Sequence, residues 1–109
     1  MGEEIACEYL EEIGIDVIDR NYYTNSGEID IIAKEKNEYI FIEVKTRLSK
    51  KYGTPIESIN QRKQKNFVSA SKYYIHMNKL ENKFIRFDVI EIYINGPKRL
   101  INHVRNVFF

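Results

Sequence analysis

Two acidic residues and a lysine form the pattern in this sequence that most strongly indicates chemistry. Asp30 lies in one run of strand-like residues, and Glu43 and Lys45 lie in the next run. The connection between the runs is short enough for a β-hairpin with a two-residue turn at Lys36 and Asn37. In that register Asp30 and Glu43 are directly opposed, and their carboxylates would repel each other unless a cation neutralised them.

A divalent metal would neutralise such a pair more fully than a lysine. Mg²⁺ prefers oxygen ligands and keeps some of its water. We therefore expect Asp30 and Glu43 to bind Mg²⁺ or Mn²⁺, with the carbonyl oxygen of Val44 as a further ligand. The metal would lower the pKa of its bound water, and the Lys45 ammonium would stabilise the charge that grows on a phosphoryl group. The predicted chemistry is the hydrolysis of a phosphodiester.

Other interpretations of these residues stay open on sequence grounds. Asp30, Glu43 and Lys45 could form a surface ion-pair cluster, in which each pair contributes only ~0.2–1 kcal/mol. The chain could also be a nucleic-acid-binding or protein-interaction module without catalysis, or a subunit whose site a protein partner completes. Glu28 is either an accessory ligand or a solvated residue beside a turn. An enzyme is favoured because a pure binder gains nothing from two acids that face a phosphate.

The distribution of charge indicates a polyanionic partner, although the formal net charge is only +1. Between Lys45 and Lys72 there are eight basic residues and a single acidic residue, Glu57. Such segregation creates a dipolar surface that attracts nucleic acid, with DNA as the expected partner; the alternative is a solvated Lys-rich loop and helix face. The predicted nucleic-acid contacts in this segment are Arg47, Lys50, Lys51, Tyr52, Gln61, Arg62, Lys63 and Lys65.

Length and composition are those of one globular domain over residues 1–109. Apolar residues make up 43% of the chain, and a chain of this length can bury ~65% of its unfolded surface. One cysteine excludes an intramolecular disulfide, and with only two histidines a zinc site built on these residue types is excluded as well. The sequence has neither an apolar run of ~18 residues nor an export signal, so we expect a cytoplasmic protein without membrane contact.

Hydrophobic periodicity predicts an α/β fold. A helix is expected over 2–13, strands over 16–23, 28–34 and 38–45, a second helix over about 60–77, and strands over 84–94 and 100–107. Residues 46–53 are expected to form a polar loop, and Thr54 begins a capping box. The order of helix, three antiparallel strands, helix and two strands indicates a central mixed β-sheet flanked by helices.

The expected hairpin predicts which residues pair across the two strands and on which face of the sheet each side chain lies. Alternation along the two strands places Asp30, Glu43 and Lys45 on one face of the sheet. The predicted cross-strand pairs are Lys34 with Tyr39, Ile32 with Phe41, and Asp30 with Glu43. The residues expected on the opposite, core-facing side are Ile29, Ile31, Ile40, Ile42 and Val44.

Three motifs, taken in order, resemble those of a known family. They are Gly-Glu-Ile-Asp at 27–30, Glu-Val-Lys-Thr-Arg at 43–47 and Arg-Phe-Asp-Val at 86–89. With them, nearly the whole chain resembles the YraN-like family of small bacterial proteins. That family looks like a branch of the PD-(D/E)XK nuclease superfamily, to which the archaeal Holliday junction resolvases are similar.

The resemblance implies a restriction-endonuclease-like fold and an endonuclease-like site. Asp30 and Glu43 match the metal ligands of the superfamily, and Lys45 matches its catalytic lysine. Glu3 matches an acidic residue on the first helix that supports the metal through water. The implied substrate is DNA, either linear or branched. Because a chain of this size covers only part of a long or branched duplex, a homodimer with two sites is a further expectation.

Overall fold

The computed structural model describes residues 2–48 and 61–107. The elements are α1 (Gly2–Glu12), β1 (Asp16–Thr24), β2 (Gly27–Glu35), β3 (Glu38–Leu48), α2 (Gln61–Met77), β4 (Phe84–Asn95) and β5 (Lys98–Val104). This order is the one that periodicity predicts. Lys50, Lys51, Tyr52 and the capping box at Thr54 lie outside the described residues. Within the described ranges, no helix is long and apolar enough to cross a membrane.

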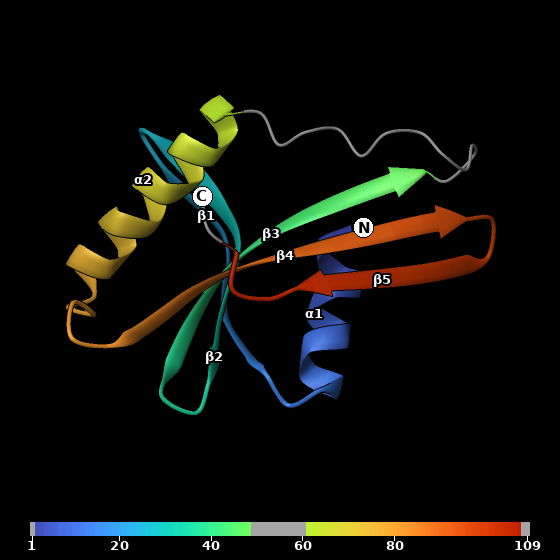
Figure 1. The fold of residues 1–109 in the computed structure, drawn as a ribbon, viewed down its shortest axis with the longest axis horizontal. Coiled ribbons are helices and arrows are strands. Elements are labelled where there is room, and N and C mark those ends of the chain that lie inside the picture. Colours follow the sequence, from blue (N-terminus) through green and yellow to red (C-terminus); the bar gives the residue numbers. More distant parts are fainter. Residues whose placement is uncertain (1, 49–60, 108–109) are drawn as a thin grey trace.

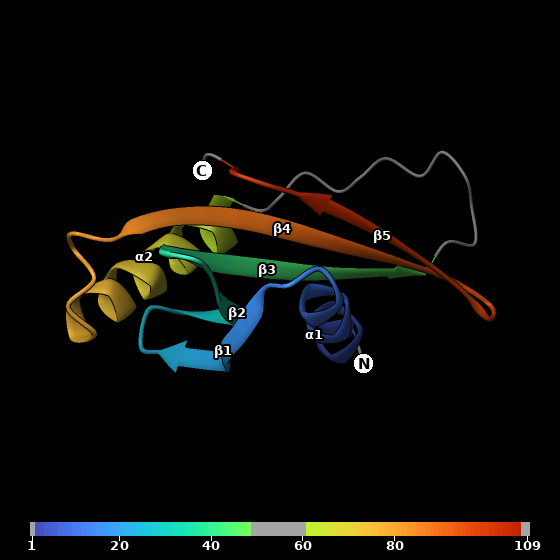
Figure 2. The ribbon, with the colours of Figure 1, turned by 90° about the horizontal axis from the view of Figure 1, so that it is seen from below.

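All five strands form one mixed sheet in the order β1-β2-β3-β4-β5. Neighbouring strands are antiparallel except β3 and β4, which are parallel and have α2 between them in the chain. A parallel pair needs such a crossover because a tight turn cannot connect it. Helix α2 lies towards one end of these long strands, and α1 lies towards the other (Figures 1 and 2).

The two helices bury opposite faces of the sheet. Ile40 and Ile42 of β3 share a buried cluster with Leu10 of α1, whereas Phe41 shares another with Phe67 of α2. This division follows from the alternation of side chains along a strand. The central strands are therefore apolar on both faces where a helix covers them, and a mixed α/β sheet flanked by helices is confirmed.

The predicted hairpin register is confirmed over most of its length. Its turn contains Lys36 in the left-handed conformation (φ 54°) that a tight hairpin requires. The ladder stops one pair short of Asp30 and Glu43, so the prediction that these two are backbone partners is wrong. The observed pairs are Glu35 with Glu38, Lys34 with Tyr39, Ala33 with Ile40, Ile32 with Phe41, and Ile31 with Ile42.

Ile29 does not share the core of Ile31, contrary to prediction. Ile31 packs in the cluster of α1, while Ile29 packs in the cluster of α2. On the N-terminal side of Ile31, β2 is not paired with β3 and is paired only with β1. The β1–β2 ladder contains an irregularity between Val17 and Asp19, and Asn21 of β1 has a left-handed conformation with φ 51°. Simple alternation along β2 therefore does not hold where β2 leaves β3, and Ile29 packs with α2.

Strands β3 and β5 differ from their predicted bounds. Residues 46–48 belong to β3 and not to a polar loop, because parallel pairing with β4 continues as far as Leu48 and Ile94. The backbone groups of this polar stretch thus gain partners in the sheet. The last strand covers Lys98–Val104 instead of 100–107, since the chain turns at Gly96 (φ 59°) and pairs at once with β4.

A buried carboxylate on β4 organises a polar network on the α1 side of the sheet. Asp88 is fully buried, and its oxygens lie 3.0 Å from the Nε of Arg86 and 2.7 Å from the Nε2 of His103. The backbone N–H of Asn106 donates to the same carboxylate at 3.0 Å. The Nδ1 of His103 is in turn 2.8 Å from the hydroxyl of Tyr9 on α1. One side chain therefore connects α1, β4 and the chain beyond β5.

The guanidinium of Arg86 extends this network to the β2–β3 hairpin. It lies 3.3 Å from Glu35 and 2.7 Å from Glu38, which are paired across that hairpin. Burial alone would raise the pKa of Asp88, but hydrogen bonds from His103 and Arg86 hold that pKa below its ordinary value. Its stabilising contribution is accordingly present above the unfolded pKa of about 4 and is lost as the pH falls through the lower folded value.

We expect Asp88→Ala to destabilise the fold strongly, by about 3–5 kcal/mol, because Arg86 and His103 would keep buried polar groups without their partner. Urea denaturation at neutral pH measures the free energy of unfolding. Asp16→Ala is the matched control, since Asp16 is exposed and its loss should change stability by less than ~0.5 kcal/mol. Equal stability of the two variants would show that the network does not hold the fold together.

Candidate functional site

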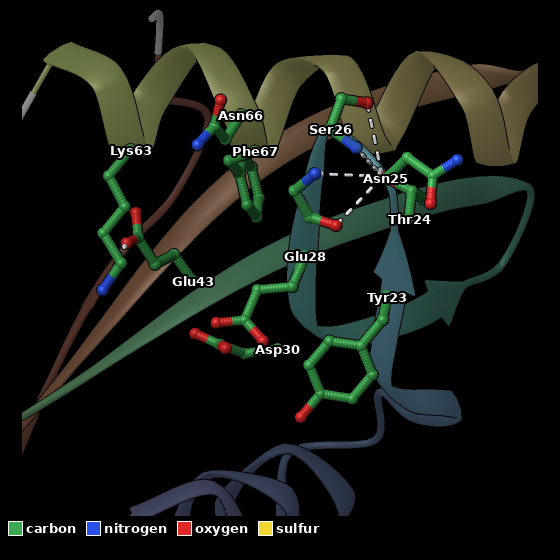
Figure 3. Close-up of a pocket in the computed structure, with 11 residues that line it drawn as sticks. Tyr23, Thr24, Asn25, Ser26, Glu28, Asp30, Glu43, Lys63, Asn66 and Phe67 are labelled. Atoms are coloured by element: carbon green, nitrogen blue, oxygen red, sulfur yellow. Dashed lines mark hydrogen bonds and ion pairs between the residues drawn. The ribbon is translucent and has the colours of Figure 1, made fainter.

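A cleft of about 540 Å³ lies between the β1–β2 hairpin and the first turns of α2. Its lining includes Glu28 and Asp30 of β2, Glu43 of β3 and Lys63 of α2 (Figure 3). The fold thus brings two predicted metal ligands, Asp30 and Glu43, into one cavity. The possible accessory ligand Glu28 and the predicted nucleic-acid contact Lys63 line the same cavity. The cleft is the candidate site because it gathers most of the acidic residues singled out from the sequence.

The wall of the cleft is a rigid turn that packs closely against α2. The hydroxyl of Thr24 accepts hydrogen bonds from the backbone N–H groups of Ser26 (3.2 Å) and Gly27 (3.1 Å), and it lies 3.0 Å from the carbonyl of Gly27. A Cβ atom at Gly27 would overlap the backbone carbonyl group of Asn66 in α2. Only glycine therefore permits this approach of hairpin to helix.

Asp30 connects the two strands at the point where their ladder ends. The backbone N–H of Val44 donates to its Oδ2 at 2.8 Å. The last backbone pair is Ile31 with Ile42, so the carboxylate takes the place that a backbone carbonyl of β2 would otherwise occupy. Asp30 thus approaches β3 beside Glu43 through its side chain, which is why the predicted proximity survives although the predicted pairing fails.

Burial and neighbouring carboxylates make the charged form of Asp30 unfavourable. Burial raises the pKa of Asp30 to about 6; the hydrogen bond from Val44 opposes this rise, and the carboxylates of Glu3, Glu43 and Glu28 add to it. Glu3 belongs to α1, far away in sequence, so the fold brings it within electrostatic range of Asp30. These carboxylates repel one another and together favour a bound cation.

Glu43 has a buried oxygen that is left unsatisfied. Its side chain is only 4% exposed, and its Oε1 lies 3.9 Å from the Nζ of Lys63. Its Oε2 is buried without any hydrogen-bond partner. Leaving a carboxylate oxygen in this state is costly, and Lys63, whose side chain is 64% exposed, compensates weakly. This unsatisfied oxygen is suited to bind a cation or to accept a hydrogen bond from a ligand.

Lys45 and Arg47 continue the face of Glu43 along β3, as alternation predicts. Lys45 is half-buried and is in register with Glu91 of β4; it does not line the cleft. The Nε of Arg47 lies 3.5 Å from Glu91, which also accepts a hydrogen bond from Asn102 at 2.8 Å. Arg47 therefore forms an ion pair within the sheet, although its Nε has no hydrogen-bond partner among the described residues, and its contact with nucleic acid stays a prediction.

The other predicted nucleic-acid contacts that the structure describes lie at the start of α2. Gln61 is its first residue, and Arg62 and Lys65 are exposed in its first turns. Sequence reasoning missed Tyr23, which lines the cleft. The available signal was its place just before the Asn-Ser-Gly turn, where a hairpin pairs it with Glu28.

The oxygen atoms of this site suit a metal ion whose ligands come partly from the protein and partly from water and substrate. Within the part of the chain that the structure describes, they do not form a complete ligand set made by the protein alone. Among the described residues, no three His, Cys, Asp or Glu side chains come together closely enough to hold a metal ion. Mg²⁺, however, is commonly held by one or two carboxylates, with water and substrate phosphate as its other ligands. Asp30 and Glu43, with the carbonyl of Val44, match that donor set, and the unsatisfied Oε2 of Glu43 is the specific observation in its favour.

We expect Asp30→Asn to stabilise the metal-free protein at pH 7 by on the order of 1–3 kcal/mol. Asparagine keeps an oxygen acceptor for the N–H of Val44 and removes the charge. Because the pKa of Asp30 rises from 3.8 to about 6 on folding, the folded state holds more protons in this window, and the free energy of unfolding falls as the pH rises through it.

Urea denaturation at pH 7 and at a pH well below the ordinary aspartate pKa of 3.8 tests this expectation. The gain should vanish at the lower pH, where Asp30 is protonated in both states. Asp16→Asn, at an exposed position, is the control and should show no gain at either pH. A variant no more stable than the parent at pH 7 would contradict the burial of a strained carboxylate at position 30.

Comparison with known proteins identifies the family. Residues 2–92 match a model described as "Uncharacterised protein family UPF0102". A UPF0102 protein of Clostridioides difficile (strain 630) is 46% identical over 107 residues, covering 98% of this chain and 92% of the relative. One from Clostridium botulinum (strain 657 / Type Ba4) is 48% identical over 110 residues, covering 98% and 89%.

Among solved structures, the one described as "Crystal structure of SSO0001" is 17% identical with a TM-score of 0.35, and the match covers 97% of this chain and 52% of that chain. We draw no conclusion from so distant a likeness. The extensive identity to its bacterial relatives and the match over residues 2–92 show that this chain belongs to the UPF0102 family, which confirms its resemblance to the YraN-like proteins.

Proposed function

We propose that this protein is a Mg²⁺- or Mn²⁺-dependent, endonuclease-like phosphodiester hydrolase that acts on DNA. The observation that carries the proposal is the buried, unsatisfied Oε2 of Glu43 in the same cleft as Asp30. A surface ion-pair cluster would bring its acids together with bases, whereas here burial and further carboxylates act on Asp30. The mixed sheet and its element order support a restriction-endonuclease-like fold as part of this proposal.

Each residue has a distinct part in the proposed reaction. Asp30, Glu43 and the carbonyl of Val44 hold the metal, and Glu3 supports it through water. When bound, the metal supplies positive charge at the phosphoryl oxygens and a more acidic water molecule. Lys45 holds its ammonium on the same face of β3 as Glu43 and stabilises the negative charge that develops on the phosphate.

The basic residues provide the attraction to DNA. Arg62 and Lys65 are exposed at the start of α2, beside the cleft that Lys63 lines. Lys50, Lys51 and Tyr52 belong to the same basic segment of the sequence and remain proposed contacts. A homodimer, or a protein partner, would let so small a chain engage a long or branched duplex. With DNA as the substrate, the proposed location is the cytoplasm.

Calorimetric titration with Mg²⁺ or Mn²⁺ should show binding to the parent chain and loss of binding in Asp30→Asn and Glu43→Gln, because each removes one negative ligand. Lys45→Ala should still bind the metal but cleave labelled DNA about 10²-fold more slowly, since it loses a group that stabilises the transition state. Linear duplex and four-way junction are the two substrates to compare.

Lys72→Ala is the matched control, because Lys72 is an exposed lysine of α2 outside the cleft. It should cleave like the parent chain. Cleavage unaffected by Lys45→Ala would overturn the proposed role of that residue. A parent chain that binds no divalent metal, with or without DNA, would instead favour a non-catalytic nucleic-acid-binding or protein-interaction module.

A further inference from the structure

Tyr23 places an exposed aromatic ring in the wall of the acidic cleft. Its relative exposure is 69%, and Figure 3 shows the ring beside the side chains of Glu28 and Asp30. The preceding residue, Tyr22, packs against Tyr74 of α2 with ring centroids 5.0 Å apart. Because neighbouring residues of a strand face opposite ways, the packing of Tyr22 inside directs Tyr23 outwards.

The backbone that carries this ring is fixed by the hairpin. Tyr23 is the cross-strand partner of Glu28, and the next residue, Thr24, closes the turn through its hydroxyl. β1 is also an edge strand of the sheet. An aromatic ring carried by an ordered hairpin at an exposed edge is a surface on which a flat ligand can stack.

The size of the cleft limits what can occupy it. A volume of about 540 Å³ is that of a small-molecule pocket. The major groove alone of a DNA duplex is ~12 Å wide and ~8.5 Å deep, so a segment of intact duplex is larger than this volume, whereas a single nucleotide is not. A nucleotide inside a duplex must leave its stack before it can enter a pocket of this kind.

We propose that the cleft binds one unpaired nucleotide of single-stranded DNA, with the base stacked on Tyr23 and the adjoining phosphate directed at Asp30 and Glu43. The direction of the phosphate rests on the function proposed above. The preferred substrate is then a single-stranded stretch, such as a flap, a gap or a frayed end, and not a closed duplex. Stacking accepts every base, so this recognition is tolerant of sequence.

The charge of the cleft adds a second requirement. Glu28, Asp30 and Glu43 line it, and Lys63 is the only cation among the described lining residues. A phosphate is repelled by this excess of negative charge until a divalent cation offsets it. Stacking on Tyr23 and binding of the cation must therefore act together, and single-stranded DNA should bind only weakly when the cation is chelated.

Fluorescence anisotropy with a labelled, short oligothymidylate tests the proposal, with Ca²⁺ in place of Mg²⁺ to limit cleavage. Tyr23→Ala and Tyr23→Leu should weaken binding about tenfold or more, because both lose the aromatic face. Tyr23→Phe should bind like the parent chain. Tyr73→Ala is the control, since Tyr73 is a 49% exposed tyrosine outside the cleft. Circular dichroism checks that each variant is folded.

Two further probes separate this inference from the proposed function. A blunt duplex and the same duplex with a single-stranded flap are compared for binding and for Mg²⁺-dependent cleavage, and the flap should be preferred by about tenfold or more. If the blunt duplex is bound and cut as well as the flap, or if Tyr23→Ala leaves oligothymidylate binding unchanged, the inference fails while metal-dependent cleavage still supports the nuclease. If no DNA is cut but oligothymidylate binding depends on Tyr23, the inference about single-stranded DNA stands and the proposed nuclease function fails.

Discussion

The hydrogen bond from the backbone N–H of Val44 to Asp30 is the contact on which the candidate site depends. It occurs where β2 separates from β3, and it satisfies a backbone donor that the separation would otherwise leave unpaired. The same separation lets β2 follow β1 towards α2, which opens the cleft and buries Ile29 there. A carboxylate of suitable length at position 30 therefore joins fold and chemistry in one residue.

The cost of this arrangement is an accumulation of negative charge. Asp30 is affected by Glu3 of α1, Glu28 of β2 and Glu43 of β3, and burial adds to their effect. Such a charged site is less stable than its neutral counterpart would be. The fold tolerates this charge because the two apolar clusters on opposite faces of the sheet stabilise the folded state.

The two faces of the sheet have different electrostatic characters. On the α1 side, Asp88 has all its partners supplied by the protein, and its pKa is held low. In the cleft, the pKa of Asp30 is raised and Glu43 keeps an oxygen without a partner. A buried acid that is fully satisfied stabilises structure, whereas one that is incompletely satisfied is suited to an external cation. This contrast distinguishes a structural carboxylate from a candidate functional one.

The sequence by itself determined the order of helices and strands, the hairpin turn at Lys36 and Asn37, and the shared face of Glu43 and Lys45. These features follow from local periodicity and turn chemistry, which act over a few residues. Periodicity could not predict that Ile29 would leave the face of Ile31, because this depends on where β2 separates from β3 and on packing against α2.

The tertiary structure alone decided which distant side chains meet. It paired Arg47 with Glu91, brought Lys63 to Glu43, and exposed Tyr23 beside the acidic residues. Each of these contacts joins residues from different elements, and its geometry depends on how the helices and the hairpin pack on the sheet. Residue types and spacing identify the groups that can do chemistry, but only long-range packing sets which of them share a cavity and which are satisfied by the protein itself.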